Sequence, residues 1–419
     1  MKTDLLADRH IGIQEADLPA MLEKIGVKSL DELINKTIPS KIRLKEPLAL
    51  AAPMTEREFA EHIAGLASLN KIYTSYIGMG WYDTITPAVI QRNVFENPAW
   101  YTSYTPYQTE VSQGRLEALL NFQTVISDLT AMPLANCSLL DEATAAAEAA
   151  TMMYGLRSRD QQKKGTNVLF VDESIFPQNL AVIQTRVIPQ GMKIQVGNYK
   201  ELEFTPEIFA CIIQYPNASG SVEDYREFVE KAHAANCKVA VDADILSLAL
   251  LLPPGEWGAD IVFGSTQRLG IPLFYGGPSA AYFATRDEYK RNMPGRIIGL
   301  SKDKYGKICY RMALQTREQH IKREKATSNI CTAQALLATM AGFYAVYHGQ
   351  EGIKNIAKRI HSIATWLNKA LARLGYVQHN EIFFDTLRFS LPDHVSAQKL
   401  RTIALSKDCL LYTSPSPRD

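Results

Sequence analysis

Two polar residues at the ends of predicted strands are the first candidates for chemistry. Asp242 closes the apolar segment KVAVD, and Arg268 follows 26 residues later, just beyond the apolar segment DIVF at 260–263. Both segments predict strands. Small ligands of α/β sheets bind beyond the carboxyl ends of the strands, so Asp242 and Arg268 could meet in such a crevice. The alternative is an ordinary turn, since Asp244 follows Asp242 closely.

The spacing of these residues resembles the large domain of fold-type-I pyridoxal-phosphate enzymes. In those enzymes an Asp at one strand end pairs with the pyridinium nitrogen, and a lysine after a later strand forms the Schiff base. The segment Ser265–Arg268 has the expected Ser-x-x-basic layout, but its basic residue is arginine. A guanidinium stays protonated and cannot be the aldimine nucleophile. The resemblance therefore implies a cofactor position without its anchoring lysine.

A predicted helix start gives a second indication of a degenerate site. Ser138 and Asp141 form an S-x-x-D start for the Ala-rich helix expected at 141–157. In a cofactor-binding copy, the equivalent helix N-terminus would hold the phosphate. Asp141 and Glu142 would instead repel a phosphate dianion while satisfying the helix end themselves. We therefore expect Asp141, Glu142, Asp242 and Arg268 to be degenerate cofactor-binding positions, with Asp242 and Arg268 pairing locally.

Three longer segments carry distinctive motifs. They are DRHIG at 8–12, the stretch 76–130 with its strings ENPAWYTSYTPYQ and QGRLE, and NCSLLDEATAAAEA at 136–149. Together they closely resemble the glycine-cleavage P-protein family, the decarboxylating glycine dehydrogenases, from about residue 5 to 408. The family has two homologous halves, fused or separate, and only the second carries the Schiff-base lysine. This chain resembles the first half, with Arg268 at the lysine's place.

The resemblance implies the cofactor and the partners. Pyridoxal phosphate would be held by the partner half, either the C-terminal half of one long chain or a second subunit. The substrate would be glycine, and the aminomethyl group would pass to the lipoyl arm of H-protein. The isolated chain would be inactive. Whether the two halves are fused is left open by the sequence.

An aromatic tract at residues 72–109 is the expected contribution of this chain to the site. It holds eight Tyr or Trp residues together with several Thr, Asn and Pro, which predicts neither a helix nor a regular strand but a functional surface rather than disorder. Candidate site-lining residues, in and just after the tract, are Asn97, Tyr104, Thr105, Tyr107 and Arg115. A Tyr ring offers a rigid apolar face with one hydrogen-bonding tip, which suits a channel for a lipoyl arm. The alternative is that these residues only pack between the halves.

The elements around these residues alternate between helix and strand. Helices are predicted at 55–70, 113–130, 141–157, 177–186, 222–236 and 352–375, and strands at 167–171, 210–214, 238–242, 260–263, 280–284 and within EIFFDTLRFSL near 381–391. Apolar strands between helices predict a mostly parallel sheet covered on both faces. The expected fold class is α/β, with a fold-type-I transferase-like large domain, a helical N-terminal lead-in and a truncated small domain.

The expected domain organisation follows from composition shifts and the family resemblance. We expect a helical extension at 1–55, the large domain at 56–327 and a partial small domain at 328–408. Residues 409–419 do not resemble the family, so we expect a non-native tail there.

Composition excludes several other classes of protein. The chain has 419 residues and a formal charge of +1, which gives no reason to expect nucleic acid as a partner. No apolar run approaches the length of a membrane span and no secretory signal is evident, so a cytoplasmic protein is expected. The six cysteines show no metal-ligand spacing. A P-loop, an HExxH motif and a nucleophile elbow are all absent from the sequence.

Two other functions compete with an enzyme half. The first is a non-catalytic scaffold that binds the partner half or H-protein. The second is a self-sufficient pyridoxal-phosphate enzyme that uses another lysine, such as Lys302 or Lys304. Neither lysine lies at a strand end after the Asp, which disfavours this alternative.

Overall fold

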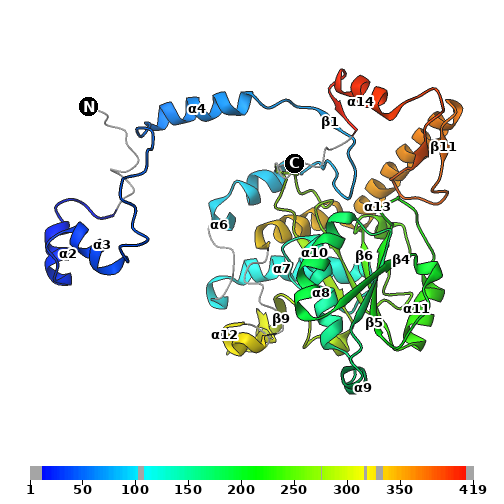
Figure 1. Ribbon diagram of the computed structural model, residues 1–419, viewed down its shortest axis with the longest axis horizontal. Helices are drawn as coiled ribbons and strands as arrows, with labels where there is room; N and C mark the ends of the chain where they lie inside the picture. Colours follow the sequence, from blue (N-terminus) through cyan, green and yellow to red (C-terminus); the bar gives the residue numbers. More distant parts are fainter. Residues whose placement is uncertain (1–11, 102–107, 275, 316–318, 327–333, 412–419) are drawn as a thin grey trace. The chain divides into compact units, whose positions relative to one another are not determined.

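The computed structural model of the chain describes residues 12–101, 108–274, 276–315, 319–326 and 334–411 (Figure 1). It forms two compact units, Met1–Tyr73 and Thr74–Asp419. The division lies at the start of the aromatic tract. The domain boundaries expected at residues 55, 327 and 408 stay predictions. None of the helices in the described ranges is long and apolar enough to cross a membrane.

The described residues of the first unit, 12–73, form three helices joined by loops. They are α2 (Leu18–Ile25), α3 (Leu30–Thr37) and α4 (Glu56–Ser68). The side chains of Ser29 and Thr55 begin α3 and α4 by accepting hydrogen bonds from backbone N–H groups of the first turn, which would otherwise lack a partner. Helix α4 confirms the helix predicted at 55–70. Among the apolar side chains of residues 12–73, only that of Val27 is buried.

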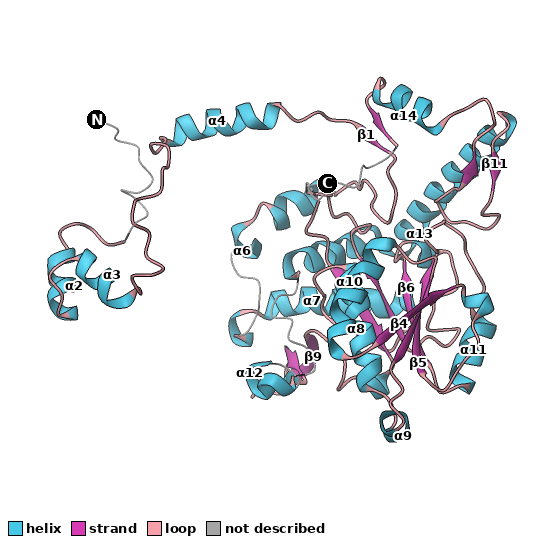
Figure 2. Ribbon diagram, in the orientation of Figure 1, coloured by secondary structure: helices cyan, strands magenta, loops and turns pink. Residues whose placement is uncertain are grey.

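A seven-stranded sheet forms the core of the second unit (Figure 2). Its strands are β2 (Leu134–Ala135), β3 (Val168–Asp172), β4 (Lys193–Gly197), β5 (Ile208–Tyr215), β6 (Lys238–Ala243), β7 (Ile261–Ser265) and β8 (Ala281–Thr285). Their order is β2-β8-β7-β6-β5-β3-β4. The strands from β7 to β4 run parallel, whereas β8 is antiparallel to both β7 and β2. The predicted mostly parallel sheet is confirmed.

Helices cover both faces of this sheet. One face carries α8 (Glu142–Gly155) and α10 (Pro177–Val187), and the other carries α7 (Gln113–Thr130), α11 (Arg226–Ala234) and the first part of α13 (Ala335–Arg373). Successive residues of β5 therefore enter different cores: Ile212 packs in the same cluster as Ala149 of α8, and Ile213 in the same cluster as Phe122 of α7. Burial on both faces explains why the central strands are continuous apolar runs.

Several elements differ from the prediction. Strand β4 lies at the edge of the sheet and its side chains are mostly exposed, so it lacks the apolar run that marks the inner strands. A hairpin of β9 (Ile297–Lys302) and β10 (Ile308–Ala313) was not predicted either, and it forms a separate antiparallel pair. Two short helices outside the predicted helical ranges, α9 (Arg159–Lys163) and α12 (Gln319–Lys322), also lie in the second unit.

The prediction that the aromatic tract contains no helix was wrong. The tract holds α5 (Ala88–Ile90), a π-helical turn at Gln91–Phe95 and α6 (Pro98–Tyr101). Pro87 immediately precedes α5, and α6 begins at Pro98. Proline presets the backbone for a first helical turn and needs no hydrogen bond to its nitrogen, so it starts helices as readily as it interrupts them.

The C-terminal part consists of a long helix and small sheets. Helix α13 combines two helices across Gly349, whose backbone is non-helical (φ 64°, ψ 176°). After it come β11 (Val377–Gln378), β12 (Phe389–Ser390) and α14 (Ala397–Leu405), and β13 (Cys409–Leu410) pairs in parallel with β1 (Thr74–Ser75). The strand predicted near 381–391 is confirmed only as the two residues of β12. The truncated small domain and the non-native tail stay predictions.

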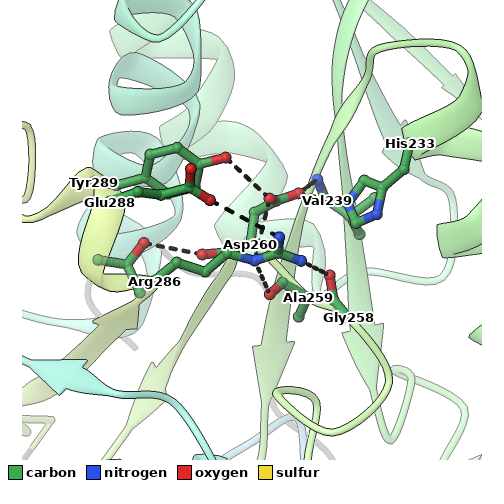
Figure 3. Close-up of polar contacts among 9 residues, drawn as sticks. His233, Val239, Gly258, Ala259, Asp260, Arg286, Glu288 and Tyr289 are labelled. Carbon is green, nitrogen blue, oxygen red and sulfur yellow. Dashed lines mark hydrogen bonds and ion pairs between the residues drawn. The ribbon is translucent and has the colours of Figure 1, made fainter.

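A polar cluster stabilises the amino-terminal edge of the sheet, before β7 (Figure 3). The carboxylate of Asp260 is buried, and it accepts a hydrogen bond from the backbone N–H of Val239 at 2.8 Å and lies 2.9 Å from Nε2 of His233. Arg286 lies 3.5 Å from the same carboxylate, and the Tyr289 hydroxyl donates to it at 3.3 Å. Burial by itself would raise the pKa of Asp260, but the hydrogen bonds with His233 and Val239 and the charge of Arg286 outweigh it and lower the pKa.

Replacing this carboxylate is expected to destabilise the fold. The Asp260→Asn variant should lose roughly 2 kcal/mol of unfolding free energy, because hydrogen bonds to a charged acceptor become bonds to a neutral one. Since the folded pKa is lowered, the stabilisation is present above the ordinary pKa of Asp and is lost as the pH falls through the lowered value. Urea unfolding at neutral pH measures the loss. Asp287→Asn, which removes an exposed partner of Lys290, is the control and should change little; equal losses would contradict the role of Asp260.

Candidate functional site

Three of the four expected degenerate positions, Glu142, Asp242 and Arg268, meet where the central strands end. Strands β6 and β7 are parallel neighbours, with Asp242 opposite Phe263, so Asp242 and the residues after β7 lie at the same edge of the sheet. A cavity of about 50 Å³ lies there. Its polar lining includes Glu142, Gln214, Asp242, Asp244, Arg268 and Asp385. A space of this size holds a few water molecules.

Glu142 is in direct contact with the strand-end Asp. The amide nitrogen of Asn179 donates to Oε1 of Glu142 and to Oδ2 of Asp242, both at 2.7 Å. The two carboxyl groups are also hydrogen-bonded to each other. Because a bond between two carboxyl groups needs a proton, Glu142 and Asp242 share one. The first turn of α8 thus supplies the hydrogen-bonding partner of Asp242.

Both carboxyl groups hold their protons more tightly than usual. Removal from water raises the pKa of Glu142 to about 7, although the Asn179 amide opposes the shift. Burial, followed by the negative charge of Glu142, raises the pKa of Asp242 well above its ordinary value. Burial also raises the pKa of Asp244, against the attraction of Arg268. One shared proton at neutral pH therefore limits the negative charge in this cavity.

Arg268 is held by two other carboxylates. Its Nη1 lies 2.7 Å from Oδ2 of Asp244, and its Nη2 lies 2.6 Å from Oδ2 of Asp385. Burial would lower the pKa of Arg268, but the two aspartates raise it further instead. Tyr82 covers the guanidinium, with 3.9 Å between the Arg268 Cζ atom and the ring centroid. Arg268 thus pairs with Asp244 rather than with Asp242.

These residues do not fit a bound pyridoxal phosphate. The position expected for a lysine holds an arginine whose side chain is 7% exposed and paired twice. The carboxyl expected to meet a pyridinium nitrogen is already bonded to Glu142. Asp141 accepts a hydrogen bond from the Thr144 backbone at 2.7 Å, so a carboxylate occupies the helix end where a phosphate would bind. A second cavity of about 310 Å³ adjoins this helix end, but Asp141 and Glu142 both line it.

The other predicted residues do not gather at this cavity. Asn97 caps α6, accepting from the Ala99 backbone at 3.0 Å, and Arg115 donates to the Ala99 carbonyl. Asn97 and Arg115 therefore lie near each other but do not line the cavity. Tyr104, Thr105 and Tyr107 lie outside the described residues. Lys302 ends β9 and Lys304 follows in the hairpin turn, and neither lines the cavity.

Three residues of the site were missed by reasoning from the sequence. Asn179 lies in α10, Tyr82 in the aromatic tract and Asp385 before β12. Asp385 is separated from Arg268 by more than a hundred residues, and no local pattern connects them. Asp244, noted only as a turn neighbour, was the one available signal. No group of three or more His, Cys, Asp or Glu side chains among the described residues is arranged to hold a metal ion.

The sheet order, the helices on both faces and the strand-end cavity define a fold-type-I α/β fold. A structure of alanine–glyoxylate aminotransferase from Nostoc sp. is similar, with a TM-score of 0.53 at 15% identity, covering 91% of this chain and 90% of that one. A likeness at this identity concerns the fold alone.

The chain belongs to the glycine cleavage system P-protein family, whose family model matches residues 8–415. The family predicted from the motifs is therefore confirmed. A glycine dehydrogenase (decarboxylating) of Bacteroides thetaiotaomicron is 80% identical over 408 residues, which cover 97% of this chain and 43% of that protein. The chain thus spans less than half the length of this relative.

A solved member of the family has a closely similar structure. It is a glycine decarboxylase (P-protein) of the glycine cleavage system in inhibitor-bound form, with a TM-score of 0.85 and 31% identity. The similarity covers 98% of this chain and 92% of that chain. A P-protein chain of about this length therefore exists beside the longer relatives.

Proposed function

We propose that this chain is the half of a glycine decarboxylase that does not anchor the cofactor. In this proposal it forms a wall of the site where glycine is decarboxylated and the aminomethyl group passes to the lipoyl arm of H-protein. Pyridoxal phosphate is held by the partner half. The observation that carries the proposal is the double pairing of Arg268 with Asp244 and Asp385, at the place where a Schiff-base lysine would be needed.

The contacts of Glu142 support the same division of labour. The Glu142 carboxyl is the hydrogen-bonding partner of Asp242. Glu142 also lies next to Asp141, whose carboxylate caps the start of α8. A pyridine ring and a phosphate would both have to displace carboxyl groups to bind here. Relatives more than twice as long as this chain provide a further segment in which a complete site can lie.

A reconstitution experiment tests the wall role. We expect replacement of Tyr104 and Tyr107 by Ala in the complete two-half protein to lower kcat/KM for H-protein about tenfold or more, because each side chain would lose its contact with the lipoyl arm. Glycine-dependent release of carbon dioxide, with lipoylated H-protein as acceptor, gives the rate. Tyr305→Ala is the matched control, since Tyr305 is 76% exposed on the β9–β10 hairpin.

The same experiment distinguishes the enzyme wall from a scaffold. If turnover and KM stay at the wild-type values in both tyrosine variants, the tract does not line the site. The chain would then be a scaffold that binds the partner half or H-protein. A loss of turnover that Tyr305→Ala does not reproduce supports the wall.

A further inference from the structure

The residues around Arg268 connect three segments that are far apart in the sequence. The first is the beginning of the aromatic tract, residues 79–86. The second is the pair of strand ends that carry Asp244 and Arg268. The third is the loop 382–386 before β12. We call Tyr82, Asp244, Arg268 and Asp385 the Arg268 clasp.

Each arm of the clasp is a separate contact with the guanidinium. Asp244 accepts a hydrogen bond from Nη1 at 2.7 Å, and Asp385 forms an ion pair with Nη2 at 2.6 Å. The side chains of Arg268 and Asp385 are 7% and 10% exposed, so water screens this ion pair little. The Tyr82 ring stacks on the guanidinium at 3.9 Å, and its hydroxyl lies 3.3 Å from Oγ1 of Thr386. The first and third segments therefore also touch each other.

Additional hydrogen bonds fix each outer segment to the sheet. In the aromatic tract, the carbonyl of Tyr82 accepts from the side chain of Gln267 at 2.7 Å, and Thr84 donates to the carbonyl of Ile271 at 2.8 Å. In the loop, the backbone of Phe383 forms an isolated antiparallel β-bridge with that of Ser221. The clasp thus joins residues 79–86 to the loop 382–386, and both segments already lie against the strand ends.

We propose that Arg268 is a positioning residue that holds residues 79–86 and the loop 382–386 in one fixed arrangement over the strand ends. A lysine has a single ammonium group on a flexible stem, which could not present two separate nitrogens to opposed carboxylates and also stack on a ring. A buried ion pair often adds little net stability compared with apolar packing. The expected effect of the Arg268 ion pairs is therefore to hold the two segments in one conformation rather than to raise the unfolding free energy. The clasp would order these segments whichever reaction the complete protein catalyses.

The test replaces a residue in one arm of the clasp and measures amide hydrogen exchange in the segment that carries the other arm. In the full chain, Asp385→Asn keeps the shape of the loop side chain but removes its charge. We expect amide hydrogen exchange in residues 79–86 to become about tenfold faster or more, as for the loss of a hydrogen bond to a charged group. Conversely, Tyr82→Leu removes the stacked ring, and exchange in residues 382–386 should accelerate. Exchange in β5 and β6 should not change.

Two further variants make the result decisive. Arg268→Lys is expected to accelerate exchange in both segments, because one ammonium cannot replace the bridge. Asp224→Asn is the control, since it removes an exposed carboxylate that pairs with Arg226 outside the cavity. If each arm variant accelerates exchange only in its own segment, or if Asp224→Asn has the same effect, Arg268 does not couple the segments. Should Asp385→Asn fail to fold, Tyr82→Leu decides by the same criterion.

Discussion

The full chain mixed with pyridoxal phosphate is expected to form no stoichiometric aldimine. Borohydride reduction followed by peptide mapping should find no single lysine modified above the background of exposed lysines. The physical reason is that Arg268 cannot lose its proton to act as a nucleophile, and its guanidinium is already bonded to Asp244 and Asp385. A stoichiometric adduct on one lysine, such as Lys302 or Lys304, would make the chain a cofactor enzyme by itself.

The Arg268→Lys variant sharpens this expectation. An amine at this position is not sufficient, because Glu142 still bonds to Asp242 and Asp141 still occupies the helix end. We therefore expect labelling at position 268 to stay far below one equivalent in the single variant. Stoichiometric labelling there would show that the missing amine is the sole obstacle to the cofactor.

A pH-dependent gain in stability is expected when Glu142 is replaced by Gln. The folded chain raises the pKa of Glu142 from 4.5 to about 7. Between these values the folded state keeps a proton that the unfolded state has lost, so the unfolding free energy of the wild type falls with rising pH, by about 1.4 kcal/mol per unit for a full proton. The Gln amide can donate to Asp242 without titrating. The Glu142→Gln variant should match the wild type near pH 4 and exceed its stability by roughly 3 kcal/mol at pH 8.

Urea unfolding at a series of pH values measures this difference. Glu230→Gln is the matched control, because Glu230 is exposed on α11 and its replacement should leave the pH profile of the wild type. A difference between Glu142→Gln and wild type that is constant from pH 4 to 8 would mean that Glu142 and Asp242 do not share a proton in the folded chain.

The inner part of the fold was predictable because its residues carry a local signal. Strands β5 and β6 are buried on both faces, so almost every residue in them is apolar and the pattern needs no knowledge of the partners. The edge strand β4 alternates irregularly between exposed and half-buried side chains, and the aromatic tract folds into short turns that begin at prolines. In both places the structure depends on contacts with distant segments, which a local pattern does not contain.

The contacts within the site were even less predictable from local sequence patterns than the fold. Asp242 and Arg268 could be placed at strand ends, and the acids of α8 could be recognised as unfavourable for a phosphate. The bond between Glu142 and Asp242 and the pairing of Arg268 with Asp385 were not predictable, since they depend on how α8 and the loop before β12 pack on the sheet. Substitution of the lysine was visible in the sequence, but the new contacts of the arginine were not.

A substitution of Gly349 is expected to alter this site although the residue does not line the cavity. The residue is exposed, and a side chain there would meet no atom within 4 Å, so tolerance judged from available space would be high. Its backbone, at φ 64° and ψ 176°, is a conformation open essentially to glycine alone. The angle at Gly349 directs the second part of α13. Ile353 and Ala357 of this part belong to the same buried cluster as Phe384, the neighbour of Asp385. A missense change here would leave every residue of the cavity intact and yet turn the helix that supports one arm of the clasp.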